Sequence, residues 1–290
     1  MNRRQFINRS AALLAIGSIA GQNACSTTSA RRIGIQLYSV RNDLPVDFEG
    51  TLRKISEMGY SSVETYGLNE DKFFNYTMKD FRALISDMGM SISGTHAGSR
   101  ILPEDTNEPE WDYWKKLAET LKTVDAGWAV QAGFPGAGTI DDLKRIAEHF
   151  NRVGEICRQG GVKFAYHNHH RELGKIDDVV ILEYLIKNTN PETVFFQLDM
   201  GHVVRGGGDC LRLLREYPTR IPLWHASDYN AETVQYTDIG KGNVPYAEMF
   251  GLPKSGGLEV LTVEQETLED IFGSLQANFD YLKQFRWTRM

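Results

Sequence analysis

Residues 162–172 read VKFAYHNHHRE, an apolar run of strand length that turns polar at its end. The polar end carries three histidines, His167, His169 and His170. An amphipathic segment at 139–159 precedes the run, and a second one follows at about 177–189. Short apolar strands between amphipathic helices are typical of βα units, in which parallel strands are covered by helices. The stretch therefore predicts a buried parallel strand with a polar carboxyl end.

The same alternation continues in both directions and gives eight strands. Eight βα units in about 250 residues favour a closed (β/α)8 TIM barrel over an open doubly wound sheet. No Gly-x-Gly-x-x-Gly follows the first strand, so nothing supports a dinucleotide-binding fold. We expect one α/β barrel domain over residues 31–290. The expected strands are 33–40, 61–66, 90–98, 128–133, 162–169, 193–202, 221–228 and 258–266, and the expected helices are 46–58, 77–89, 110–127, 139–159, 177–189, 208–216 and 268–285.

Residues 1–30 have the features of an export signal. Arg3 and Arg4 resemble a twin-arginine signal, and they precede AALLAIGSIAG, an apolar run too short to span a bilayer. Cys25 is a candidate for lipid attachment, although Gln22 stands where an aliphatic residue is usual. We expect a protein that is exported, periplasmic or lipid-anchored to a membrane facing the periplasm. The alternative is a buried amphipathic helix at the N-terminus.

The charge of the chain argues against nucleic-acid binding. The formal net charge is −6, and no cluster of lysine and arginine is interleaved with aromatic residues. Proteins that bind nucleic acids need a basic surface to neutralise phosphates. We therefore expect no nucleic-acid partner, and membrane contact only through a lipid anchor at Cys25.

Acids and histidines gather at the carboxyl ends of the predicted strands, where barrel enzymes carry their chemistry. Six of the seven histidines lie there, and only His149 lies within a helix. A single strand-end histidine can be a simple hydrogen-bonding residue, and Asp199 can cap the turn that leads to His202. The convergence of such residues from four strands favours a shared metal site. A ligand set without thiolates suits Mn²⁺, Zn²⁺, Fe²⁺ or Co²⁺.

Five motifs carry a resemblance to a known family. VKFAYHNHHREL, QLDMGHVVRGG, WHASD, DIGKGNVPY and LTVEQE, in this order, resemble the sugar phosphate isomerase/epimerase superfamily of xylose isomerase-like TIM barrels, which is related to inosose dehydratase and endonuclease IV. The resemblance covers the chain after residue 32. It implies a divalent metal, and a catalytic or ligand-supporting role for His202. The metal ligands that it implies are His167, Asp199, His225 and Glu264.

The chain departs from this family at the stretch quoted first. Relatives commonly read Glu-Asn-His where this chain reads His167-Asn168-His169. An imidazole in place of a carboxylate makes a metal site one charge more positive and a stronger Lewis acid. It also removes a carboxylate that could act as a base. The departure weakens an epimerase mechanism that uses two metal-bound glutamates, and it keeps a lyase in contention.

We expect a metal-dependent sugar isomerase or epimerase that transfers a proton next to a carbonyl. The metal would polarise the carbonyl and stabilise an enediolate. Glu264 is the first candidate base, with His202 and His169 behind it. A lyase or dehydratase acting on a keto sugar or keto-glycoside is the second hypothesis, and a carbohydrate-binding barrel without catalysis is the third. A DNA-repair endonuclease shares the fold but would need a basic groove.

The expected substrate is a non-phosphorylated sugar or keto sugar, because sugar phosphates are intracellular and the chain carries an export signal. Lys241 has an equally ordinary explanation as a solvated loop lysine. The side chains expected to contact the carbohydrate are Glu64, His96, His170, Glu172, Lys241 and Trp224.

Overall fold

The computed structural model describes residues 33–98, 108–266 and 269–287. The predicted export signal over residues 1–30, with Cys25, lies outside the described residues. Among the helices that are described, none combines the length and the apolar character needed to cross a membrane.

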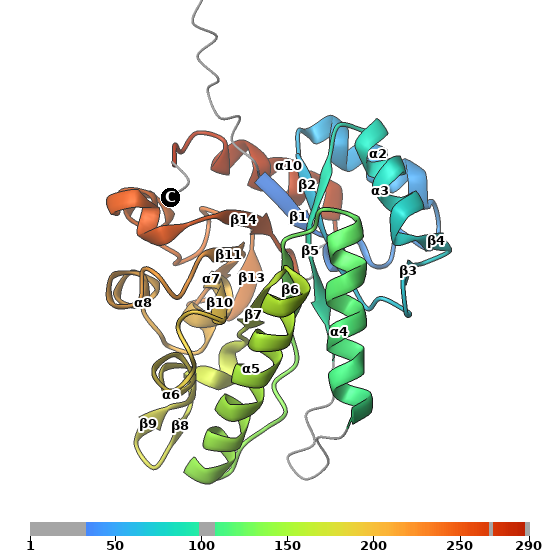
Figure 1. Cartoon of the computed structure of the whole chain (residues 1–290). Coiled ribbons are helices and arrows are strands. Elements are labelled where there is room, and N and C mark those ends of the chain that lie inside the picture. Colours follow the sequence, from blue (N-terminus) through green and yellow to red (C-terminus); the bar gives the residue numbers. More distant parts are fainter. Residues whose placement is uncertain (1–32, 99–107, 267–268, 288–290) are drawn as a thin grey trace, which may run out of the picture. The chain divides into compact units, whose positions relative to one another are not determined.

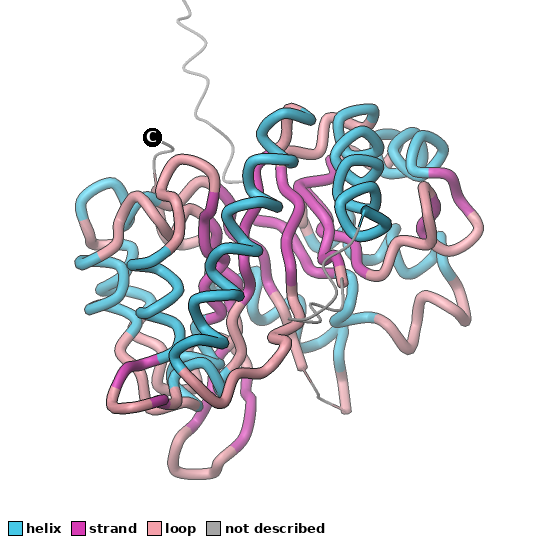
Figure 2. The backbone as a smooth tube through the Cα atoms, turned by 60° about the horizontal axis from the view of Figure 1, so that its bottom comes forward, coloured by secondary structure: helices cyan, strands magenta, loops and turns pink. Residues whose placement is uncertain are grey.

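Eight parallel strands close into a barrel, and helices surround it (Figures 1 and 2). The prediction of a (β/α)8 TIM barrel is confirmed. Each barrel strand pairs with the barrel strands before and after it in the chain, and the first pairs with the last. In chain order the strands are β1 (Ile33–Gln36), β2 (Ser62–Tyr66), β5 (Ser91–Ala97), β6 (Trp128–Gln131), β7 (Lys163–His167), β10 (Val194–Asp199), β11 (Leu223–Ala226) and β14 (Val260–Val263).

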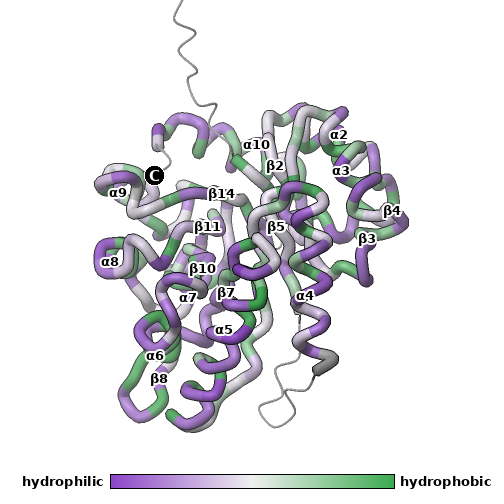
Figure 3. The backbone as a smooth tube through the Cα atoms, viewed as in Figure 1, coloured by the Kyte–Doolittle hydropathy of each residue, from purple (hydrophilic) through white to green (hydrophobic). Residues whose placement is uncertain are grey.

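Amphipathic helices form the outer layer, and hydrophilic and hydrophobic residues alternate along them (Figure 3). Several begin at a polar residue whose side chain accepts a backbone N–H, which satisfies a donor that the helix itself leaves unpaired. In this way Asp47 caps the helix that begins at Phe48, Thr77 caps the one that begins at Met78, and Thr139 caps the one that begins at Ile140. The outer helices are α2 (Phe48–Met58), α3 (Met78–Asp87), α4 (Glu108–Thr123), α5 (Ile140–Gly160), α6 (Ile181–Asn188), α8 (Cys210–Glu216) and α10 (Ile271–Leu282).

The strands are shorter than predicted, because the polar residues at their ends bind backbone groups and turn the chain. The side chain of Gln36 accepts the N–H of Tyr38 and starts the 3₁₀ helix η1 (Leu37–Val40). The strand expected over 193–202 ends at Asp199, whose side chain caps the short helix α7 (Met200–Arg205). The predicted strands therefore ran into turns that form part of the loops above the barrel.

The connections between the barrel strands also contain short elements that the sequence did not predict. They are the hairpins β3 (Lys72–Phe73) with β4 (Tyr76–Thr77), β8 (Lys175–Ile176) with β9 (Val179–Val180), and β12 (Asp228–Asn230) with β13 (Gln235–Thr237), the helix α9 (Tyr246–Phe250), and the 3₁₀ helices η2 (His170–Leu173) and η3 (Pro253–Gly257).

Asp228 organises the loop that follows β11. Its Oδ1 accepts the backbone N–H groups of Tyr229 and Val244 at 2.9 and 3.0 Å. Its Oδ2 accepts those of Gly240 and Gly242 at 2.8 and 3.1 Å. Four hydrogen bonds to one buried carboxylate hold the β12–β13 hairpin against the segment that carries DIGKGN.

The barrel interior has an apolar lower part and a polar upper part. Alternation along a strand sends successive side chains to opposite faces. Along β11, Leu223 and His225 face the interior, whereas Trp224 and Ala226 belong to the apolar layer under the helices. Near the amino ends of the strands the interior is filled by an apolar cluster of Trp128, Val130, Ala165 and Leu223, with Phe195 and Val260 packed against it.

We expect Asp228→Asn to lower the free energy of unfolding by about 3 kcal/mol, because an amide NH₂ would face two backbone donors that now share a carboxylate oxygen. Urea denaturation followed by circular dichroism measures the change. Asp87→Asn, at an exposed carboxylate on α3, is the matched control and should stay within about 0.5 kcal/mol of the wild type. Equal stability of both variants would contradict the role given to Asp228.

Candidate active site

A cavity of about 570 Å³ opens at the carboxyl ends of the barrel strands. This volume lies in the range of roughly 300–1,000 Å³ that is usual for small-molecule sites. The residues of its wall lie at the carboxyl ends of seven barrel strands or just after them, namely β1, β2, β5, β6, β7, β10 and β14. The polar and aromatic residues of the wall are Tyr38, Tyr66, His96, His167, His169, His170, His202, Arg205, Glu264 and Glu266.

Four buried side chains meet at the inner end of this cavity. One ligand atom from each of His167, Asp199, His225 and Glu264 lies within 4.8 Å of those of the other three. The strand register explains the meeting, since Asp199 is paired with His225 across β10 and β11. These are the four positions at which the family resemblance implies metal ligands.

Beneath the cluster, Glu64 lies almost fully buried, with 2% of its surface exposed. Its Oε1 accepts from the Gln197 amide at 2.9 Å. Its Oε2 accepts from the Gln36 amide at 2.9 Å and lies 2.6 Å from His225 Nε2. Burial alone would raise the pKa of this carboxyl, but the charges and hydrogen bonds of His96 and His225 hold it well below its usual range.

His225 links this buried acid to the cluster. Its Nε2 faces Glu64, and its Nδ1 lies 2.8 Å from Glu264 Oε2. Burial disfavours the charged ring, yet the two carboxylates outweigh burial and raise the His225 pKa to about 10. The same ring lowers the pKa of Glu264 in spite of its burial. An imidazolium therefore lies between two carboxylates inside the barrel.

Asp199 both caps a helix and offers a free oxygen. Its Oδ1 accepts the His202 backbone N–H at 2.7 Å and the Ser227 hydroxyl at 2.6 Å. The Asp199 N–H donates to Asn168 Oδ1 at 3.1 Å, which ties this strand end to β7. Its Oδ2 is buried and has no hydrogen-bond partner. The cap considered from the sequence is present, and the second oxygen remains available to a ligand.

His167 presents an uncharged ring to the same point. Its Nδ1 is buried without a partner, and its Nε2 lies 3.9 Å from Glu264 Oε2. Burial first, and the neighbouring His225 and His96 next, lower the His167 pKa well below its usual value. Neutral imidazole is the form that binds metals. A neutral ring, a free carboxylate oxygen and a second carboxylate fit a divalent transition metal.

His202 lies between two polar partners at the side of the cavity. Its Nδ1 is hydrogen-bonded to the Tyr236 hydroxyl, and its Nε2 lies 3.3 Å from Glu266 Oε1. Burial opposes the charge on this ring, but Asp199 and Glu266 outweigh it and raise the His202 pKa. In the charged ring both nitrogens carry protons, so Nδ1 donates to the Tyr236 oxygen and Nε2 carries its proton toward Glu266. His202 therefore holds a proton toward the cavity.

The structure brings to the cavity wall His96 and His170, which were predicted to contact the substrate, and His169, which was predicted as a candidate base. The expectation for Glu64 changes, because this side chain lies under the cluster with its oxygens occupied and does not line the cavity. Glu64 instead supports His225 from below.

Three expected substrate contacts need correction. Glu172 is fully buried, where it accepts from the Tyr166 hydroxyl and the His169 N–H and caps η2. Trp224 is fully buried on the outer face of β11, with its ring 5.4 Å from that of Phe250. Lys241 is exposed, pairs with Asp238 at 2.7 Å and does not line the cavity.

Sequence reasoning missed several residues of the wall. Tyr38 and Tyr66 form an edge-to-face pair with ring centroids 5.3 Å apart. Tyr38 lies just after β1 and Tyr66 is the last residue of β2. This position at a strand end was the signal from which a place in the cavity wall could have been predicted. Arg205 lies inside the motif that carries Asp199, but its place on α7 was not foreseen. Tyr236 lies in a stretch that read as irregular, so nothing indicated its contact with His202.

Comparisons with known proteins agree with the fold. The model of the xylose isomerase-like TIM barrel family matches residues 52–289, so the chain belongs to this family. The inosose dehydratase of Geobacillus kaustophilus (strain HTA426) is 22% identical over 268 residues, which cover 84% of this chain and 85% of that protein.

Solved structures show the same barrel. A sugar phosphate isomerase/epimerase from Parabacteroides distasonis ATCC 8503 is 28% identical, with a TM-score of 0.80 over 89% of this chain and 95% of that one. The 3-keto-D-glucoside 4-epimerase of E. coli is 15% identical and shares the fold, with a TM-score of 0.64 over 87% of this chain and 99% of that one. The relatives are sugar enzymes of the isomerase, epimerase or dehydratase type.

We expect Glu64→Gln to lower the free energy of unfolding by about 3–5 kcal/mol, because it removes one partner of a buried ion pair. The His225 pKa should fall from about 10, since one of its two carboxylates is lost. Denaturant unfolding measures the first effect, and ring ¹⁵N chemical shifts measured against pH give the second. Glu266→Gln, which alters an acid outside the His225 contacts, is the control and should leave the His225 pKa in place.

Proposed function

We propose that this chain is a divalent-metal-dependent enzyme that moves a proton at the carbon next to the carbonyl of a non-phosphorylated sugar or keto sugar, as an isomerase or epimerase. The observation that carries the proposal is the buried cluster of His167, Asp199, His225 and Glu264 at the inner end of a cavity of small-molecule size. The dehydratase and epimerase relatives support the same class of chemistry.

The unpartnered atoms of the cluster are what a metal would use. Asp199 Oδ2 and His167 Nδ1 are buried without hydrogen bonds, a cost that a bound cation would relieve. A divalent ion held there would supply Lewis-acid chemistry, which polarises a carbonyl and makes the neighbouring C–H more acidic. His225 would release its Nδ1 proton to bind the cation, and Glu64 would stay on its Nε2 as the kind of carboxylate partner that orients a metal-binding histidine.

Proton acceptors lie on more than one element of the cavity. Glu264 lines the cavity from the segment after β14, and its lowered pKa keeps it ionised at neutral pH. His169 lines it from the segment after β7, and burial together with the charge of His202 lowers the pKa of His169. A carboxylate and a neutral imidazole can each take a proton from a substrate carbon.

The outer wall suits a sugar ring. Tyr38 and Tyr66 offer aromatic surface on one side, where the C–H face of a sugar ring can pack. Arg205 and Glu266 offer a hydrogen-bond donor and an acceptor on the other side. The proposed export of the protein, which rests on Arg3 and Arg4, also favours a substrate without phosphate.

A lyase or dehydratase is the second candidate, and two observations favour it. His202 holds a proton on Nε2 toward the cavity, so it could protonate a departing hydroxyl or alkoxide. The strand-end position of β7 carries the neutral His167, so the cluster lacks a second glutamate for symmetric proton exchange. In this version the electrons of the broken C–H bond form a double bond as the leaving group departs.

The purified protein should contain about one divalent transition metal ion per chain after expression in metal-replete medium. Asp199→Asn should weaken metal binding about 100-fold, because it replaces the free carboxylate oxygen. Elemental analysis and calorimetric titration of the chelator-treated protein measure both. His170→Ala is the control, since His170 belongs to none of the clustered groups. An empty wild-type site under these conditions would sink the proposal.

Incubation of the metal-loaded enzyme with keto sugars in D₂O should place deuterium at the carbon next to the carbonyl. Glu264→Gln should lower the exchange rate about 10²–10⁴-fold, because it removes an ionised acceptor. Proton NMR follows the exchange, and the same spectra separate a new isomer from a released leaving group. A binding protein without catalysis would show no exchange with any sugar.

A further inference from the structure

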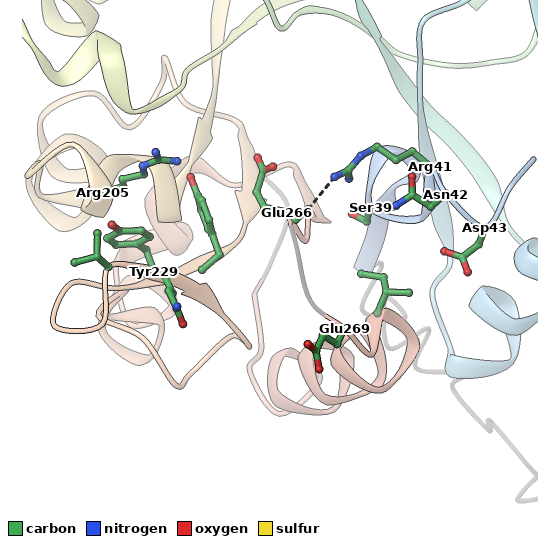
Figure 4. Close-up of a pocket in the computed structure, with 12 residues that line it drawn as sticks. Ser39, Arg41, Asn42, Asp43, Arg205, Tyr229, Glu266 and Glu269 are labelled. Atoms are coloured by element: carbon green, nitrogen blue, oxygen red, sulfur yellow. Dashed lines mark hydrogen bonds between the residues drawn. The ribbon is translucent and has the colours of Figure 1, made fainter.

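A second cavity, of about 770 Å³, lies beside the first. It is bounded by η1 and the turn after it, by the β12–β13 hairpin, and by the side chains of Glu266 and Glu269 (Figure 4). Arg205 and Glu266 line both cavities, so the two spaces adjoin at these side chains. Nothing in the proposed proton transfer uses the second space.

The lining of the second cavity suits a neutral group with many hydroxyls. Two cations, Arg41 and Arg205, line the cavity together with three acids, Asp43, Glu266 and Glu269. A phosphate would gain the arginines but would meet three carboxylates, and like charges at close range are costly. A polyol, in contrast, can donate to the carboxylates and accept from the guanidinium groups.

Neutral polar and aromatic side chains add to this character. The amides of Asn42 and Gln235 line the cavity, and each supplies both a donor and an acceptor. Tyr229 and Tyr236 line it as well, with ring centroids 5.3 Å apart. Aromatic rings beside mixed hydrogen-bonding groups form the kind of surface against which a sugar ring packs.

The contact between Tyr236 and His202 forms the partition between the two spaces. Tyr236 lines the second cavity, His202 lines the first, and the two side chains are hydrogen-bonded. The Nε2 of His202 lies 3.3 Å from Glu266, a residue of both cavities. A substituent that runs from the first cavity into the second therefore passes His202 and Tyr236.

We propose that the second cavity binds a sugar unit attached to the reacting ring, so that the substrate is a disaccharide or a related glycoside, not a free or phosphorylated monosaccharide. This inference rests on the proposed function in one respect, namely that the first cavity takes the reacting sugar. It adds a second site and a substrate class, and it holds for an epimerase as well as for a lyase.

The test compares the binding of D-glucose, glucose 6-phosphate, maltose and cellobiose to the metal-loaded protein by calorimetric titration and saturation-transfer NMR. We expect at least one of the two disaccharides to bind about tenfold more tightly than glucose, and the phosphate to give no gain. If neither disaccharide binds more tightly than glucose, the inference is overturned.

Asn42→Trp should remove the advantage of the disaccharide, because Asn42 is exposed, lines only the second cavity, and a large ring there would fill the space. Binding of glucose should stay unchanged. Val46→Trp is the matched control, since Val46 is 85% exposed on the same segment and lines neither cavity. Gln235→Ala, on the opposite wall, should weaken the disaccharide alone and gives a second test if the tryptophan variant folds poorly.

Deuterium exchange separates this inference from the proposed function. Exchange into free keto sugars as fast as into keto-disaccharides, with no effect of Asn42→Trp on either, would leave the proton chemistry standing and refute the second site. Tight disaccharide binding that Asn42→Trp abolishes, without exchange into any sugar, would support the second site and refute the proposed reaction.

Discussion

The upper half of the barrel depends on one buried carboxylate, that of Glu64. A charge inside a protein must be matched by hydrogen bonds and opposite charge, because water is absent. Gln36 supplies its amide from the neighbouring strand β1, and Gln197 and His225 reach Glu64 across the barrel interior from β10 and β11. His225 in turn fixes the position of the Glu264 carboxylate through its other nitrogen, Nδ1. The orientation of the proposed metal-binding groups is therefore set from beneath.

A polar interior has a thermodynamic cost that the rest of the barrel must offset. The lower interior is filled with apolar side chains such as Trp128, Ala165 and Leu223, and a second apolar layer lies between strands and helices. Burial of this surface supplies the main driving force for folding. The ion pairs above it contribute geometry more than stability, because desolvation consumes much of their attraction. Asp199 follows the same pattern, since one oxygen caps α7 and the other is held ready for a ligand.

Much of this could be predicted from the sequence, for reasons that have physical limits. Apolar runs alternating with amphipathic helices predicted the barrel, and the gathering of histidines at strand ends predicted where the site lies. Strand ends alone did not reveal depth, so Glu64 was expected in the cavity although it lies below it. The alternation of side chains along β11 could have separated Trp224 from His225. The β12–β13 hairpin left no periodic signal, since its order comes from Asp228 binding backbone groups far along the chain.

The imidazole at position 167 has consequences beyond the loss of one base. A carboxylate there would stand beside Glu264 and raise its pKa, as like charges do. With a neutral His167 in that place, the charged His225 ring interacts with two carboxylates, those of Glu264 and of Glu64 below, and it lowers the pKa of Glu264. Glu264 is then ionised but weakly basic, whereas His202 holds a proton beside Glu266. Acceptor and donor are thus chemically different groups. Such an asymmetric pair suits a reaction that takes a proton from one atom and delivers one to another better than a reversible exchange at a single carbon.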